Sequence, residues 1–323
     1  MATYKGIQGY SVQKLSSDPA ASEADGQLWY NTAGKFKVGT SAAGAWASGG
    51  ALNTARRGIS VGGAGTRDTA LCIGGDSPAK SEVEEYDGTA WTEKTDINTA
   101  RKSAGAAGTN TAALIIAGST PPISTLVEQW NGTGWTEIAD VTTARLETAG
   151  TGITTAALLI SGGPGSPVVD LVELYNGTSW TAAGALTTAH VQLTSAGTST
   201  AALAVGGASP SPGTNVEEYN GTAWTANPAL NNVHLGAGGA GTSTSAMTFG
   251  GGPPSFPLKA ESYNGTSWTE VADLATGGNI GGGVGADNTA ALFFGGNLGA
   301  PTDVTTTQEW SDPVYSIKTV TVS

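Results

Sequence analysis

Short apolar runs recur along the chain, and each is followed by a segment in which apolar and polar residues alternate. In residues 101–138 the run 112–118 is continuously apolar, as in a strand buried on both faces. Residues 126–130 alternate as in a half-buried strand, and Asn131-Gly132 suits a hairpin turn in which both residues have φ > 0. With the small residues of 101–108 and the segment 135–138, this stretch predicts four strands and no helix.

Tryptophan marks the same pattern every 44 or 45 residues. The marker positions are Trp46, Trp91, Trp135, Trp180, Trp224 and Trp268. A glycine pair and an aromatic residue before a turn recur with the same spacing, and four short strands per copy are the sequence form of a β-propeller. We therefore expect an all-β, six-bladed propeller with four antiparallel strands per blade, in which the tryptophans pack one blade on the next. The six copies, repeats 1 to 6, span about 56–95, 101–138, 146–182, 190–226, 234–271 and 278–311.

The two ends of the chain decide how the ring closes. Repeat 6 has a third strand near Val304–Trp310 but lacks an in-phase fourth strand of its own. Either 44–48 or 314–322 supplies that outer strand, and the other segment is then free to pair elsewhere. The expected domains are an N-terminal arm with a hairpin, residues 1–43, and the propeller, residues 44–323. The start of the arm is either a disordered leader or a segment that orders on a neighbouring subunit.

Composition excludes several classes of protein. The chain has 323 residues, of which 49 are glycine and 12% are charged, and its net charge is −12. An acidic chain repels phosphate backbones, so we expect no nucleic-acid partner. No apolar run approaches the roughly 18 residues of a membrane span, and the first residues lack the apolar stretch of a signal peptide. The single Cys72 allows no intrachain disulfide.

One position per repeat, ten residues after each tryptophan, carries a basic side chain in five of six cases. These residues are Arg56, Arg101, Arg145, His190 and His234, and Gly278 completes the series. They predict a basic ring at the channel mouth, which would bind an anion or an acidic sugar. The alternative is structural, with each arginine bridging carbonyls or a glutamate. The glutamates in question are Glu84, Glu128, Glu173 and Glu217.

The loops between second and third strands vary most and should lie on one face. They are 76–81, 119–125, 164–170, 208–214, 252–259 and 297–303. They are either a binding face or surface loops that tolerate change. Four Asn-Gly-Thr triplets match the glycosylation sequon, but the hairpin turn explains them. No catalytic motif is present, and arginines at equivalent repeat positions reflect symmetry, so we expect no catalytic residue, no metal and no cofactor.

The pattern resembles the kelch family. The resemblance lies in the glycine pair that ends the second strand, in Glu84-Glu85-Tyr86, and in Trp91 six residues before Ile97, although these copies are shorter than the usual ~50 residues. The phrases GAWASGGALNTARRG, EEYNGTAWT and GAGTxTxA look like kelch-like repeat proteins of tailed bacteriophages of marine and cyanobacterial hosts. The stretch EADGQLWYNTAGKFKVGT looks like a hairpin near the start of phage fibre and other virion proteins.

The resemblance implies a non-enzymatic virion protein assembled in the host cytoplasm, such as a tail fibre, knob or capsid-decorating protein. The arm would attach it to other virion proteins, and the loop face would contact a host-surface glycan or protein. Whether the chain forms homo-oligomers stays open. The alternatives are a soluble lectin-like, glycan-binding propeller and, less favoured, a hydrolase of acidic glycans.

Overall fold

The computed structural model describes residues 13–20, 26–31, 35–59, 64–76, 78–163, 167–208, 211–252, 258–298, 302–312 and 314–320. Every regular element in these ranges is a β-strand. No helix in the described part of the chain is long and apolar enough to cross a membrane. The chain forms two compact units, Met1–Ala45 with Asp312–Ser323, and Trp46–Ser311.

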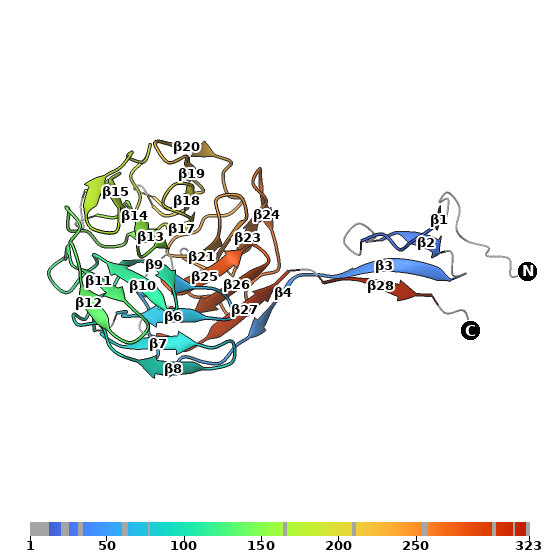
Figure 1. Ribbon diagram of the computed structural model, residues 1–323, viewed down its shortest axis with the longest axis horizontal. Coiled ribbons are helices and arrows are strands. Elements are labelled where there is room, and N and C mark those ends of the chain that lie inside the picture. Colours follow the sequence, from blue (N-terminus) through green and yellow to red (C-terminus); the bar gives the residue numbers. More distant parts are fainter. Residues whose placement is uncertain are drawn as a thin grey trace, which may run out of the picture. The chain divides into compact units, whose positions relative to one another are not determined.

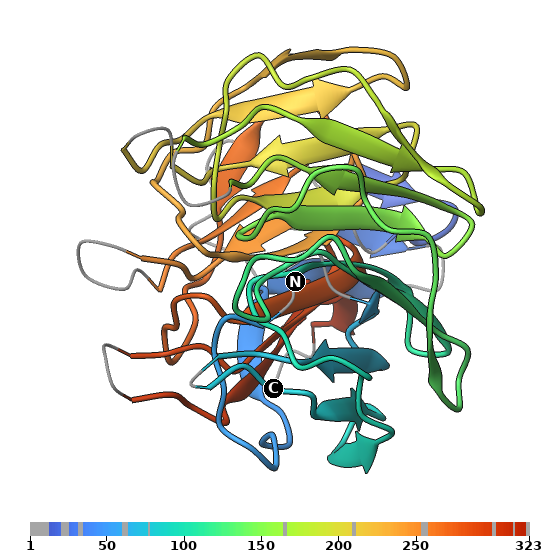
Figure 2. The same cartoon turned by 90° about the vertical axis from the view of Figure 1, so that its left-hand side faces the viewer.

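The second unit contains six four-stranded sheets, arranged around a common centre (Figure 1). Figure 2 shows the strands of neighbouring sheets side by side, with loops on both sides of the strands. The first three sheets are β5(Ala64–Gly65)–β6(Ala70–Ile73)–β7(Val83–Tyr86)–β8(Trp91–Lys94), β9(Gly105–Thr109)–β10(Ala112–Ile116)–β11(Val127–Trp130)–β12(Trp135–Glu137) and β13(Ala149–Ile153)–β14(Ala156–Ile160)–β15(Val172–Tyr175)–β16(Trp180–Ala182). The other three are β17(Thr194–Gly197)–β18(Ala202–Val205)–β19(Val216–Tyr219)–β20(Trp224–Asn227), β21(Gly238–Gly241)–β22(Ala246–Phe249)–β23(Ala260–Tyr263)–β24(Trp268–Glu270) and β25(Gly282–Asp287)–β26(Ala290–Phe294)–β27(Thr307–Ser311)–β4(Ala45–Ser48).

The second sheet has the four strands expected from its sequence pattern. Strand β10 is buried from Ala113 onward, β11 is buried except at Gln129, and only Trp135 of β12 is buried. Neighbouring strands pair antiparallel, with Trp130 opposite Trp135. The turn between them differs from the two-residue type expected. It has four residues, in which Gly132 has φ 94° while the Asn131 Oδ1 accepts the amides of Thr133 and Gly134.

The inner strands approach each other so closely that side chains do not fit between some of them. A Cβ added to Gly150 in β13 would lie 2.6 Å from the backbone oxygen of Ala106 in β9. This close backbone approach explains why glycine and alanine dominate the first strand of each repeat.

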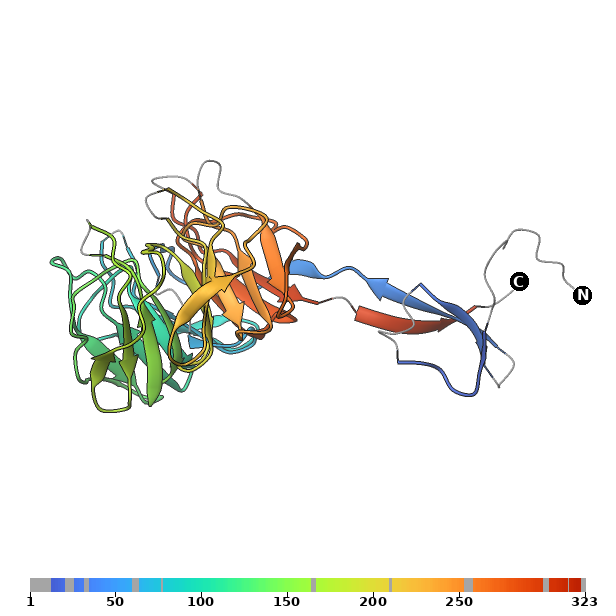
Figure 3. The same cartoon turned by 90° about the horizontal axis from the view of Figure 1, so that it is seen from above.

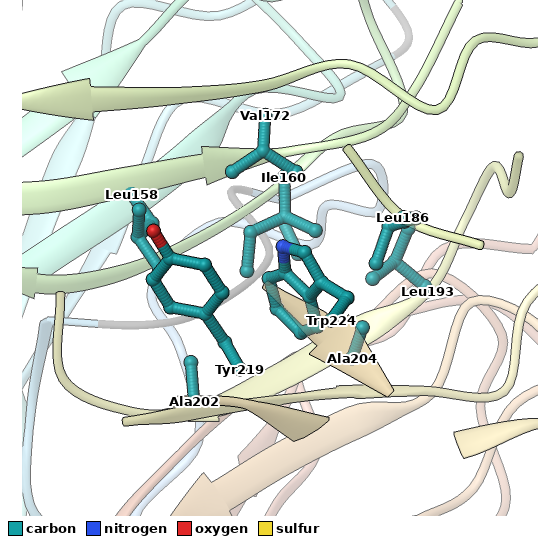
Figure 4. Packing of buried hydrophobic residues seen from close by; sticks show 10 residues of the cluster. Leu158, Ile160, Val172, Leu186, Leu193, Ala202, Ala204, Tyr219 and Trp224 are labelled. Carbon is teal, nitrogen blue, oxygen red and sulfur yellow. The ribbon is translucent and has the colours of Figure 1, made fainter. Parts of the chain in front are cut away.

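Buried apolar clusters fill the spaces between successive sheets. The cluster between β13–β16 and β17–β20 combines Leu158, Ile160 and Val172 with Tyr219 and Trp224 (Figure 4). The Tyr219 and Trp224 rings pack with their centroids 5.0 Å apart. Corresponding clusters join every neighbouring pair of sheets, including the last and the first, and each contains one of the six marker tryptophans. Trp46 alone among them is half-buried, and it packs against Phe249 and Trp310.

Strand β4, from the N-terminal side of the repeats, is the outer strand of the sheet that holds β25, β26 and β27. The other segment considered for this position is β28(Val314–Thr319), which pairs antiparallel with β3(Phe36–Ala42) in the first unit (Figure 3). The sheet of that unit has the order β1(Gln13–Leu15)–β2(Leu28–Asn31)–β3–β28. The hairpin expected in the arm is β2–β3, with Tyr30 opposite Phe36. Most of the expected leader, and parts of five variable loops, lie outside the described residues.

Candidate functional site

The five basic residues singled out in the sequence lie in the links that lead from the outer strand of one sheet to the inner strand of the next. All five are buried: Arg56, Arg101 and Arg145 are 0% exposed, His190 4% and His234 1%. The glutamate of the third strand in each of these repeats is buried as well. A buried charge is costly unless it is paired, so the partners decide what this position does.

Arg101 shows the complete arrangement. Its Nη2 donates to the Glu128 Oε1 at 2.5 Å, and its Nη1 donates to the Leu126 carbonyl at 2.7 Å. The same carboxylate accepts the backbone amides of Asn98 and Thr99 at 2.7 and 3.1 Å, and the Asn98 Nδ2 at 2.8 Å. The carboxylate therefore ties the incoming link to the third strand, while the guanidinium neutralises it. We call this arrangement the buried polar joint of its repeat.

Repeats 1 and 3 have the same joint. The Arg56 Nη2 donates to Glu84, and its Nη1 donates to the Glu82 carbonyl at 2.8 Å. The Arg145 Nη1 donates to the Glu173 Oε1 at 2.6 Å. Burial lowers the pKa of Arg145, and the nearby Glu173 opposes that effect. In both repeats the cation is paired with the glutamate of its own repeat, although the Nε of Arg145 is buried without a hydrogen-bond partner.

Repeat 5 replaces the arginine by histidine. The His234 Nε2 lies 3.4 Å from the Glu261 Oε1, and its Nδ1 lies 2.9 Å from the Gly250 carbonyl. Burial opposes ionisation of Glu261, but the nearby His234 ring and the hydrogen bonds from Asn231 and Asn232 outweigh it and lower the pKa of this carboxyl to about 2. Glu261 is therefore ionised at neutral pH and depends on its donors.

Repeat 6 has neither charge. Gly278 stands at the arginine position, and Gln308 stands at the glutamate position. The Gln308 Oε1 accepts the amides of Ala275 and Thr276 at 2.7 and 3.3 Å, and its Nε2 donates to the Thr276 carbonyl at 2.6 Å. One amide side chain thus makes the link contacts that elsewhere need a carboxylate and an arginine.

The backbone of the basic positions joins neighbouring sheets. The carbonyl of Arg101 accepts the Gly75 amide of the preceding repeat at 3.1 Å. The same bond recurs in all six repeats at 2.8 to 3.1 Å, and the Gly296 amide of repeat 6 donates to Arg56 of repeat 1. A Cβ on Gly74 would lie 2.6 Å from the Arg101 oxygen, and Gly74 has φ 62°. The donor position is glycine in all six repeats, with φ between 84° and 134°, whereas Ala117 and Ser161 take the Gly74 position in repeats 2 and 3.

A second circle of backbone hydrogen bonds lies two residues further along each link. Each amide donates to the carbonyl of the equivalent residue in the preceding repeat, at 2.8 to 3.0 Å, and Gly58 donates to Ile280 and closes the circle. All six residues have φ between 52° and 63°. The members are Gly58, Ser103, Glu147, Gln192, Gly236 and Ile280. Our sequence analysis missed this circle, because only two of its members are glycines and the side chains share no chemistry.

These contacts correct the expectation of a basic ring that binds an anion at the channel mouth. The five side chains are buried, and the three arginines donate hydrogen bonds to glutamates and backbone carbonyls. The structural alternative agrees with the geometry: each arginine bridges the glutamate of its own repeat. The sequence could show the recurring residue types, but not which way the side chains point.

The channel at the centre is narrow. A cavity of about 100 Å³ is lined by the ends of the inner strands, including Gly65, Gly152 and Gly241. Among the described residues no group of three or more His, Cys, Asp or Glu side chains is placed to hold a metal ion. Cys72 is buried in β6, and burial raises the pKa of its thiol to about 12, so it is not a nucleophile at neutral pH.

Four-stranded antiparallel sheets, repeated around a centre and joined by shared clusters, define a β-propeller repeat protein. The solved structure of YjhT is similar to this chain with a TM-score of 0.68 and 13% sequence identity, over 83% of this chain and 99% of YjhT. At this identity the likeness shows the fold alone. No protein-family model matches the chain. No curated protein matches it.

Proposed function

We propose that the chain is a six-bladed, kelch-like propeller that serves as a non-enzymatic contact platform in the virion of a tailed bacteriophage. The blade number is supported by the two circles of backbone hydrogen bonds, each of which takes one bond from each of six sheets and returns to its start. The kelch-like and phage-like phrases of the sequence support the family and the setting.

The buried polar joints favour a rigid scaffold over a reactive site. The side chains best suited to bind or transfer a charged group, the arginines of repeats 1 to 3, are enclosed and paired within their own repeats. A hydrolase of acidic glycans that uses these arginines would have to expose them and break the joints. Exposing the arginines would leave the glutamates of the joints buried without a cation, which destabilises the fold.

The observation that carries the attachment role is the pairing of the two chain ends. Strand β28 pairs with β3 over six residues, from Val314 opposite Ala42 to Thr319 opposite Lys37. Segments from both sides of the repeats therefore form one sheet, which belongs to a compact unit of its own. In the proposed role this unit binds other virion proteins, and the variable loops of the propeller meet the host surface.

Electron microscopy of purified particles, labelled with an antibody against this chain, tests the proposal. We expect the label at the tail or on the capsid surface. Purified full-length chain should also sediment with particles that lack it, and a chain without 314–323 should not. Ile153→Asp, a change at a side chain that is 54% exposed on the repeats, is the control that should still sediment.

Unlabelled particles would reject the virion role. Sugar binding by the full chain on a glycan array, without binding to particles, would instead establish the lectin-like alternative.

A further inference from the structure

A cavity of about 210 Å³ opens in repeat 4, beside the glutamate of the buried polar joint. It is lined by the link residues Thr187 and Thr188, by Glu217 of β19 and by Asn227 at the end of β20. Glu217 is 4% exposed, so its carboxylate forms part of a deep wall rather than of an open surface.

Glu217 has fewer donors than its counterparts. It accepts the backbone amides of Thr187 and Thr188 at 2.7 and 3.0 Å. In the described part of the chain no side chain donates to it, whereas Glu128 also accepts Arg101 and Asn98. The charge of Glu217 is therefore solvated less completely than the same charge in the other repeats.

The basic residue of this repeat does not compensate the carboxylate. His190 takes the arginine position, yet no ion pair joins it to Glu217 among the described residues, whereas the His234 Nε2 lies 3.4 Å from the Glu261 Oε1 in the next repeat. Burial lowers the pKa of His190, against the attraction of Glu217. The Glu217 carboxylate thus lacks the cationic side chain that its counterparts in repeats 1 to 3 have.

Short side chains leave the space beside the carboxylate open. In repeat 5 the equivalent positions hold Lys259 and Glu270, whose Nζ and Oε2 lie 3.3 Å apart. In repeat 4 the same positions are Asn215 and Ala226, which line the cavity instead of bridging it.

The missing side-chain donor indicates what kind of group would bind here. Thr187 stands where Asn98 stands in repeat 2, and no side chain replaces the hydrogen bond that the Asn98 Nδ2 donates to Glu128. A buried carboxylate that accepts only two backbone amides can accept further hydrogen bonds, and its charge favours an occupant that is positively charged.

We propose that this cavity is a binding site for a small organic cation, a guanidinium or a primary ammonium group, which donates hydrogen bonds to Glu217. The group comes either from a free small molecule or from an arginine or lysine side chain of a protein partner. The site does not depend on the proposed virion role, because it follows from the geometry of one repeat.

Methylguanidinium is the probe that tests the site in the full-length chain. We expect saturable shifts in the NMR signals of the Thr187 and Thr188 amides, and a rise in melting temperature of about 1 to 3 °C over sodium chloride at equal ionic strength. A capped Gly-Arg-Gly peptide distinguishes the sources. Tighter binding of the peptide points to a partner's side chain, and weaker or equal binding points to a free cation.

Two variants with precedents in the chain test the mechanism. Glu217→Gln copies Gln308, which accepts the same two link amides in repeat 6, and it should fold but lose the binding. His190→Arg copies repeats 1 to 3 and should lose it by supplying the cation internally. Glu137→Gln removes one exposed charge elsewhere and should bind as the natural chain does.

Equal responses of the natural chain and Glu217→Gln would overturn the proposal. So would the absence of saturable shifts with methylguanidinium, or shifts at these amides that Ca²⁺ produces and methylguanidinium does not.

Discussion

The joints of repeat 2 and repeat 6 solve the same problem with opposite chemistry. Repeat 2 holds the incoming link with an ionised Glu128 and neutralises it with Arg101. Repeat 6 holds the link with the neutral Gln308 and has Gly278 where the cation would stand. In both, the two link amides are bonded and the buried charges sum to zero. In these two repeats the rule is a satisfied, neutral joint, and the ion pair is one way to make it; repeat 4, whose Glu217 has no such partner among the described residues, departs from this rule.

Repeat 6 differs from repeat 2 also in how its sheet is completed, because its outer strand β4 comes from the other end of the repeats. Deleting residues 1–50 removes β4 and Trp46 and exposes the edge of β27, so we expect the melting temperature to fall by roughly 10 °C or the cooperative transition to disappear. Deleting 1–40 keeps β4 and should leave the transition of the repeats in place. Identical melting curves for both deletions would contradict closure by β4.

The outer strands of these two sheets also differ in the burial of their tryptophans. Trp135 in β12 is 7% exposed, whereas Trp46 in β4 is half-buried. Trp135→Ala leaves a cavity between the first two sheets and should lower the free energy of unfolding by about 3–5 kcal/mol. Trp46→Ala should cost less. Urea denaturation measures both, and a loss under about 1 kcal/mol for Trp135→Ala would refute its place in the interface.

Breaking one partner of the repeat 2 joint tests the neutrality rule directly. Arg101→Ala leaves Glu128 buried and unpaired, and we expect a loss of about 3–5 kcal/mol in the free energy of unfolding. The double change Arg101→Gly with Glu128→Gln copies the polar groups of repeat 6 and should recover part of that loss, since the space that Phe293 fills beside Gly278 stays empty in repeat 2. If the double variant is as unstable as Arg101→Ala, charge rather than neutrality is what the position needs.

Acid should separate the charged joints from the neutral one. The pKa of Glu261 is about 2 in the fold against an ordinary 4.5, so its contribution is complete above pH 4.5 and is lost as the pH falls toward 2. The shift corresponds to about 3 kcal/mol. The lowered pKa of His190 adds a loss of the same sign that begins below the ordinary pKa of 6.5. Glu261→Gln should flatten the acid limb of stability against pH, and an unchanged limb would show that other groups cause it.

The sequence was sufficient for the repeat, its strands and its packing residues. A fixed spacing of tryptophans, apolar runs and turn residues is a local pattern, and local patterns are visible in one dimension. The same repeat pattern singled out Arg101 and its equivalents. It left two possible roles for this position, binding an anion or bridging a glutamate.

Only the tertiary structure decided between those uses. Whether Arg101 faces the channel or Glu128 depends on contacts between segments about 27 residues apart in sequence, and no periodicity carries that direction. The circle through Gly58, Ser103 and Glu147 was invisible for a related reason: it is made of backbone groups, which every residue has. Residue types along the chain therefore show where the joints lie. The packing of the sheets decides which groups the side chains of each joint contact.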